Sequence, residues 1–410
     1  SSYGSENIFK LLYENRGRQP IMQPEGENYK NPYNGDLQNN PIDLMKNGGE
    51  KTIKKESYIG KAQLTIKDFI KDLRINLSAS RRAGYASQEK NMRTLTWYNH
   101  LGNVQRTANP ANSLYKEKYG DTHDILEATA NYSFSLKETH NFSVLAGSSY
   151  ENYRLDKMSG TAKNMLSNDF FSFNYYDSSI ATNTELSDEI GTWAMMSYFG
   201  RINYNYKEKY LFEANMRYDG SSRLAPSKRW RAFPSVSAAW RVSEEKWFKL
   251  GWMNSLKLRA SWGQLGNGAV LGLYDYLPLI SHSQSNAPAT YQGEKWFYQA
   301  SLASEDKTWE IIETTNLGVD FGFLNNRLTG TFEYYWKYNN EMLAGLQLPS
   351  QIGIRVPNMN VGKLKTWGWD FNINWKDQIK DFSYQIGFNI SDSKNELVQY
   401  DGASVVSEGL

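Results

Sequence analysis

The sequence contains no cysteine and only 4 histidines in 410 residues. The lack of cysteine excludes a disulfide framework and a thiolate metal site. The histidines, His100, His123, His140 and His282, share no metal-like spacing, so we predict neither a histidine-based metal site nor a bound cofactor. The 46 basic and 44 acidic residues leave a net charge of +2. This balance gives no electrostatic footprint for nucleic acid, and we expect no nucleic-acid partner.

The sequence also lacks any run of about 18 apolar residues, which excludes a helical membrane span. Its mean hydropathy is −0.66, and 14% of its residues are aromatic, with 28 Tyr and 13 Trp. This polarity does not exclude a membrane, because the inner face and the loops of a transmembrane β-barrel are hydrophilic. Tyr and Trp are also the residues that form belts at both interfaces of a bilayer.

Twelve stretches of the chain alternate apolar and polar residues. In the clearest pair, apolar residues occupy the even positions from Met196 to Tyr206 and, after a tight turn, the even positions from Tyr210 to Tyr218. Because successive side chains of a strand point to opposite faces, this pattern predicts strands with one apolar and one wet face. The six hairpins predicted in this way cover residues 58–79, 126–150, 196–219, 236–262, 317–336 and 367–390.

The connections between these stretches alternate in length. Short links are expected at 68–72, 137–141, 207–209 and 376–381, and long loops at 84–120, 154–190, 265–312 and 338–365. If neighbouring strands are antiparallel, all long loops leave from one end of the sheet, as in outer-membrane barrels. A soluble β-sandwich is the alternative, but its strands are usually only about five or six residues long and its loops do not sort by length.

We therefore predict an all-β fold, a transmembrane antiparallel β-barrel, with membrane lipid as a partner. Residues 1–410 form one barrel segment, in which 1–50 is an irregular, loop-rich entry and 51–395 contains the hairpins and their long external loops. The alternation also predicts facing: Phe212, Met216, Leu258 and Phe388 towards lipid, and Glu213, Asn215, Arg259 and Asn389 towards the lumen.

Three segments carry a more specific signal. Residues 217–223 read Arg-Tyr-Asp-Gly-Ser-Ser-Arg, residues 233–241 read Phe-Pro-Ser-Val-Ser-Ala-Ala-Trp-Arg, and residues 256–267 begin Leu-Lys-Leu-Arg-Ala-Ser-Trp-Gly. They resemble the R-x-D-G-S-S-R, F-P-S-x-S-x-x-W-R and L-K-L-R-A-S-Y-G-x-x-G-N segments of SusC/RagA-type TonB-dependent transporters, with Trp262 in place of Tyr. The resemblance extends over about residues 50–395.

The resemblance implies a multi-pass protein of the cell outer membrane that imports oligosaccharides or peptides and is not an enzyme. It implies two protein partners: a SusD-like surface lipoprotein, and TonB, which acts through a plug domain and a TonB box. It further implies a barrel of about 22 strands, of which this chain holds about twelve or thirteen.

No signal peptide, TonB box or plug is recognisable in the sequence, so we expect the chain to be the central part of such a barrel. The sheet is then expected to stay open, with residues 382–392 far from residues 5–15. The segment from Ile8 to Tyr13 reads as the end of a strand, whose partner would lie upstream.

The long loops are rich in Tyr, Trp and Asn, a composition that suits sugar or peptide binding. Aromatic loop residues also form local packing cores, and both interpretations stay open at this point. The candidates for substrate contact are Trp97, Tyr175, Tyr176, Trp230, Tyr291 and Trp296. Two further functions also stay open: a passive structural or adhesive outer-membrane barrel, and a soluble carbohydrate-active β-protein.

Overall fold

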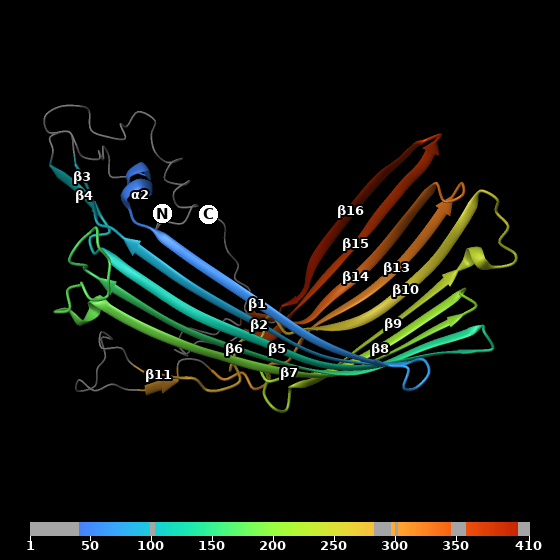
Figure 1. Cartoon of the computed structure of the whole chain (residues 1–410), viewed down its shortest axis with the longest axis horizontal. Coiled ribbons are helices and arrows are strands. Elements are labelled where there is room, and N and C mark those ends of the chain that lie inside the picture. The colour runs from blue at the N-terminus through green and yellow to red at the C-terminus, as the bar shows by residue number, and fades with distance from the viewer. Residues whose placement is uncertain (1–40, 99–102, 283–296, 300–301, 346–357, 401–410) are drawn as a thin grey trace. The chain divides into compact units, whose positions relative to one another are not determined.

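The computed structural model describes residues 41–98, 103–282, 297–299, 302–345 and 358–400. Twelve long strands form one sheet, in which neighbours follow one another along the chain in the order β1-β2-β5-β6-β7-β8-β9-β10-β13-β14-β15-β16 (Figure 1). Their bounds are β1 Lys51–Lys67, β2 Leu73–Met92, β5 Ser113–Leu136, β6 His140–Lys163, β7 Thr184–Tyr206, β8 Tyr210–Ser221, β9 Trp230–Arg241, β10 Met253–Asn267, β13 Glu310–Phe323, β14 Leu328–Gly345, β15 Asn358–Ile379 and β16 Phe382–Tyr400.

This sheet confirms the predicted fold class and all six hairpins. The sheet is also open, as predicted, because β1 and β16 lie at opposite ends of the strand order and each has one neighbour among the described residues. The strand-like segment from Ile8 to Tyr13 lies outside the described residues.

The strands are longer than the alternation predicted, which corrects the bounds of the long loops. Strand β2 continues to Met92 and β6 to Lys163. Residues 84–92 and 154–163, which were predicted to lie in long loops, are therefore strand. In these extensions the alternation of apolar and polar residues stops, because polar residues occupy both faces. The backbone hydrogen bonds between the strands continue all the same. Alternation therefore marks where one face meets an apolar phase, and not where a strand ends.

Smaller elements complete the described part of the chain. They are the helix α2 (Pro41–Asn47), the 3-10 turns η1 (Ala181–Asn183) and η2 (Val242–Glu244), and the short strands β3 (Leu95–Tyr98), β4 (Val104–Ala108), β11 (Ile280–His282) and β12 (Phe297–Gln299). Strand β3 pairs with β4, and β11 with β12. Within the described ranges no helix combines the length and the apolar character that crossing a bilayer requires.

The chain divides into two compact units. Unit 1 comprises residues 1–60, 81–123 and 153–192, and unit 2 comprises 61–80, 124–152 and 193–410. Unit 1 contains two small loop cores, one of them formed by Leu44, Leu95, Trp97 and Ala108.

Register sorts side chains across unit 2 as the alternation predicted. One row of cross-strand partners is polar: Asn203, Glu213, Ser237, Ser261 and Asn316. The adjacent row is almost entirely apolar: Tyr204, Phe212, Ala238, Ala260 and Leu317. Large apolar side chains remain exposed on the second face, with Phe212 at 45% and Met216 at 50%. An apolar face of this extent is what a bilayer covers in a membrane barrel.

The short links make the register specific. In the link between β7 and β8, Lys207 and Glu208 both have positive φ, 50° and 56°. Two consecutive residues of this kind form the turn whose twist matches that of paired strands. The side chain of Asn205 supports the turn by accepting a hydrogen bond from the Glu208 backbone N–H at 2.7 Å.

Candidate functional site: the polar face of unit 2

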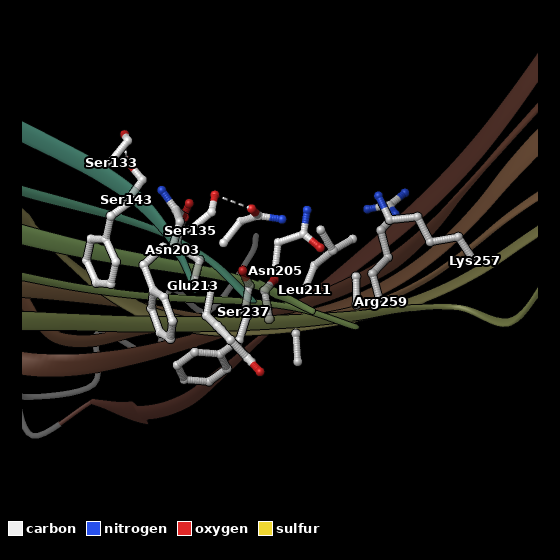
Figure 2. Close-up of a pocket in the computed structure, with 18 of the residues that line it drawn as sticks. Ser133, Ser135, Ser143, Asn203, Asn205, Leu211, Glu213, Ser237, Lys257 and Arg259 are labelled. Atoms are coloured by element: carbon white, nitrogen blue, oxygen red, sulfur yellow. Dashed lines mark hydrogen bonds between the residues drawn. The ribbon is translucent and has the colours of Figure 1, made fainter. Parts of the chain in front are cut away.

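The polar face of unit 2 carries a depression of about 1100 Å³. Strands β5 to β10 supply most of its hydrophilic lining from alternate positions, and Asn316 of β13 with Lys71 and Asp72 of the β1–β2 link supply the rest. Figure 2 shows these side chains, among them Ser133, Ser135, Ser143, Asn203, Asn205, Glu213, Ser237, Lys257 and Arg259. Most of them are hydroxyls and amides, which both donate and accept hydrogen bonds and carry no charge.

The charged groups beside this depression are joined to one another. Arg259 Nη2 donates a hydrogen bond to Glu333 Oε1 at 2.5 Å and another to Asp320 Oδ1 at 3.1 Å. Asn316 Nδ2 donates to the other oxygen of Glu333 at 2.9 Å. Lys257 Nζ lies 3.9 Å from Asp320 Oδ2. Two cations thus face two carboxylates, and this part of the wall carries no net charge.

A glycine makes this arrangement possible. Gly318 is the cross-strand partner of both Arg259 on β10 and Glu333 on β14. The Arg259 side chain therefore crosses the whole width of β13 to reach Glu333. A Cβ atom at position 318 would lie 2.8 Å from the Arg259 guanidinium carbon, closer than such atoms approach. The missing side chain leaves the space that the guanidinium fills.

A second feature of unit 2 fastens loops to the end of the sheet. Leu224, Phe233, Leu271 and Trp309 form a buried cluster. The indole N–H of Trp309 donates to the Arg229 carbonyl oxygen at 2.9 Å. Three connections, after β8, after β10 and before β13, therefore share one small core.

Residues of the three sequence segments singled out above meet at this core. Arg223 lies over the Trp193 ring at 4.5 Å and donates to the Gly268 carbonyl oxygen at 2.9 Å. Phe233 packs within the core, and its ring covers Gly266 so closely that a Cβ there would clash with it. Asn267 donates to Glu310 at 3.0 Å. These motifs therefore build the loop attachment, which explains why their residue types occur together.

The structure places two of the predicted substrate contacts away from an open loop surface. Trp97 is fully buried in the core of the β3–β4 hairpin, so it stabilises that loop and offers no free ring. Trp230 lies on the apolar face of the sheet, stacked with Tyr218 at 5.0 Å and with Tyr198 at 6.1 Å. Its position at the even-numbered start of β9 places it with the residues predicted to face lipid, as part of an aromatic belt.

The remaining candidates divide by exposure and position. Tyr176 packs against the buried cluster of Leu114, Ala162 and Met165 in unit 1. Its neighbour Tyr175 is 50% exposed, with its ring in edge contact with Phe170 at 5.3 Å. Tyr291 and Trp296 lie outside the described residues. Tyr175 thus has the largest exposed fraction of the candidates among the described residues.

An antiparallel sheet with one apolar and one hydrophilic face, and with loops fastened at one end, defines the wall of a membrane β-barrel. A family described as TonB dependent receptor-like, beta-barrel matches residues 4–407. The chain therefore belongs to the TonB-dependent receptor β-barrel family, whose members are outer-membrane proteins, and within it to the SusC/RagA type.

Individual relatives support this membership. TonB-dependent receptor SusC of Bacteroides thetaiotaomicron is 36% identical over 214 residues, which cover 51% of this chain and 21% of that protein. A TonB-dependent receptor of Formosa agariphila is 30% identical over 304 residues, which cover 72% of this chain and 28% of that protein. The solved structure of the RagAB peptide transporter shares the fold, with a TM-score of 0.76 and 21% identity over 94% of this chain and 41% of that one. The chain thus spans less than a third of the length of the two receptors.

Proposed function

We propose that the complete protein imports oligosaccharides or peptides across the outer membrane, driven by TonB and assisted by a SusD-like surface lipoprotein. The observation that carries this proposal is the hydroxyl- and amide-rich polar face of unit 2, where Lys257 and Arg259 are paired with carboxylates of the same wall. Such a surface offers many weak hydrogen bonds and few strong charges, so a hydrated oligomer can exchange contacts along it without binding tightly at one place.

One comparison supports the peptide class, because a similar solved structure is titled a peptide importer. An oligosaccharide and a peptide share the chemistry that this face would recognise, namely repeated uncharged donors and acceptors. TonB dependence is supported by the family itself.

Loop aromatics form the second part of the proposal. An exposed aromatic ring offers a flat apolar surface that stacks against a sugar or a peptide side chain. Tyr175, with Asn174 beside it, presents such a ring on unit 1. We propose Tyr175 as a substrate contact, and Tyr291 and Trp296 as further candidates.

Uptake by cells that carry the complete gene tests this function. Cells should take up fluorescent oligosaccharides or peptides when the gene is present, and uptake should stop when the proton gradient is dissipated or TonB is removed. The lipoprotein encoded beside the gene should purify with the protein. Uptake that persists without TonB, or cells that gain no uptake from the gene, would instead indicate a passive or adhesive barrel.

A further inference from the structure

The connection between β9 and β10 is the longest described link at its end of the sheet and the richest in aromatic residues. The links at 207–209 and 380–381 contain two or three polar residues, and the link at 68–72 exposes Phe69 and Ile70. Residues 242–252 contain the aromatic or aliphatic residues Trp247, Phe248, Leu250 and Trp252. Trp247 is 65% exposed, Trp252 55% and Leu250 44%. Several large apolar side chains exposed together on one link indicate a surface that meets another apolar phase.

The rings of this connection continue the apolar face of the sheet. Trp247 makes an edge contact with Trp240 on β9 at 6.3 Å, and Trp252 stacks on Phe323 of β13 at 5.5 Å. Trp240 and Phe323 both lie on the face that carries Phe212, as their register shows. The surface that faces lipid therefore extends without a break from the strands onto the connection.

Hydrogen bonds to Glu245 lie at the level where the apolar face of the sheet ends and the polar residues of the connection begin. The Glu245 carboxylate accepts hydrogen bonds from the Tyr210 hydroxyl at 2.6 Å and from the Trp240 indole N–H at 3.2 Å. Both rings thus lie along the apolar face with their polar atoms turned towards the connection. Amphipathic rings take this orientation at the interface between hydrocarbon and headgroups.

In this connection the acidic residues are paired within the described part of the chain and the lysines are not. Glu244 is paired with Arg241 at 3.0 Å, and Glu245 with Lys209 at 3.1 Å. Lys246 and Lys249 are exposed, and neither forms an ion pair with any residue that the structure describes. Two lysines without a carboxylate partner among the described residues therefore lie next to the exposed rings, whereas Glu244 and Glu245 are already paired with cations of the chain.

We propose that residues 246–252 form an interfacial anchor that binds the phosphate headgroups of anionic phospholipids, with Trp247, Leu250 and Trp252 inserted beneath them. Continuity with the membrane-facing surface supplies the apolar part of this site, and the two free lysines supply the charge complementarity. Basic residues beside inserted aromatic rings are the combination that holds a segment on an anionic lipid surface. The proposal does not depend on which substrate the protein imports.

A single label at the connection tests the anchor. The chain has no cysteine, so Leu250→Cys in the complete protein, with any cysteines outside these residues changed to serine, carries one polarity-sensitive fluorophore. The protein is placed in vesicles that contain brominated phosphatidylglycerol or brominated phosphatidylcholine. We expect the emission of an apolar environment, and stronger quenching by the brominated anionic lipid.

Charge reversal separates the headgroup contact from insertion alone. In Lys246→Glu/Lys249→Glu the preference for phosphatidylglycerol should fall by about fivefold for each lysine, while quenching by phosphatidylcholine remains. The matched control is Lys137→Glu/Lys207→Glu, which makes the same change of charge in two tight turns and should leave the preference unchanged. Equal quenching by both lipids in the labelled protein with both lysines intact, or a label quenched by aqueous iodide and not by brominated lipid, would overturn the proposal.

Discussion

Arg259 and Glu333 are hydrogen-bonded at 2.5 Å although a whole strand separates them. Gly318, on the strand between, leaves the gap through which the guanidinium passes. The bond ties β10 to β14 directly, in addition to the backbone ladders that join each of them to β13. Because the guanidinium also holds Asp320, one side chain fixes the positions of both carboxylates on the polar face.

Gly318→Ala is therefore expected to destabilise the barrel. The new Cβ would displace the guanidinium and weaken its hydrogen bonds to Glu333 and Asp320, at an expected cost of about 1–3 kcal/mol in the free energy of unfolding. Denaturant unfolding of the complete protein in detergent measures this change. Gly60→Ala is the matched control, because a Cβ at Gly60 meets nothing within 4 Å. Equal stability of the two variants would show that the space above Gly318 is not required.

Opposite faces of one strand should respond differently to the same charge. Phe212 and Asn215 both lie on β8, the first on the apolar face and the second on the polar face. An arginine in contact with lipid costs roughly 2–4 kcal/mol at the middle of the bilayer and about 0–1 kcal/mol at its interfaces, whereas a wet wall tolerates it. Phe212 lies two residues inside the interfacial Tyr210, so its cost should fall between these two values. Phe212→Arg should reduce the amount of folded protein in the outer membrane, and Asn215→Arg should not. Equal yields from both variants would contradict the assignment of the faces.

The facing of β8 could be predicted from sequence because it depends only on a period of two within one segment. The loop aromatics could not be sorted in this way. Trp97 is buried by residues that come from α2 and β4, which only the fold brings together. The facing of Trp230 could have been predicted, because it lies an even number of residues from Val236, Ala238 and Trp240 and therefore on the same face. That prediction requires a strand that continues through Pro234.

The hydrogen bond between Arg259 and Glu333 could not be predicted from the sequence. Each residue could be placed on the polar face, yet the contact depends on the register of two strand pairs and on the glycine between them. Register is set by the hairpin turns and by packing of the apolar face, so it is a property of the whole sheet. No single segment of the sequence encodes it.

Two aromatic residues should separate substrate binding from stability. Tyr175→Ala removes an exposed ring from a loop and is expected to lower uptake at low substrate concentration, with little effect on thermal stability. Trp230→Ala removes a ring that stacks with Tyr198 and Tyr218 on the apolar face, so it should lower thermal stability and leave substrate affinity unchanged. Uptake assays and thermal melting of both variants provide the comparison. A loss of affinity in Trp230→Ala would return that residue to the binding site.

Acidification should weaken the aromatic cluster at the β9–β10 connection. Hydrogen bonds from the Tyr210 hydroxyl and then from the Lys209 ammonium hold the pKa of Glu245 below its ordinary value of 4.5. The stabilisation is therefore complete above the unfolded-state pKa, and it is lost as the pH falls through the lower folded-state pKa. The difference in thermal stability between the unaltered protein and Glu245→Gln should shrink as the pH is lowered from neutral into this range. A difference that stays constant would show that the ionised carboxylate contributes nothing there.

The core shared by the loops after β8, after β10 and before β13 should open as one unit. Trp309 is 3% exposed, packs edge-on against Phe233 at 5.6 Å and donates a hydrogen bond to Arg229. Trp309→Phe keeps an aromatic ring but loses the hydrogen bond, worth about 0.5–1.5 kcal/mol, and a smaller part of the packing. Trp309→Ala also loses the ring, at about 3–5 kcal/mol, so proteolysis within 221–229 and 268–277 should rise slightly in the first variant and steeply in the second. Trp247→Ala, which removes an exposed ring at the other end of β9, is the control and should leave cleavage of these loops unchanged. Protection of one loop while the other is cleaved in Trp309→Ala would show that the loops are held separately.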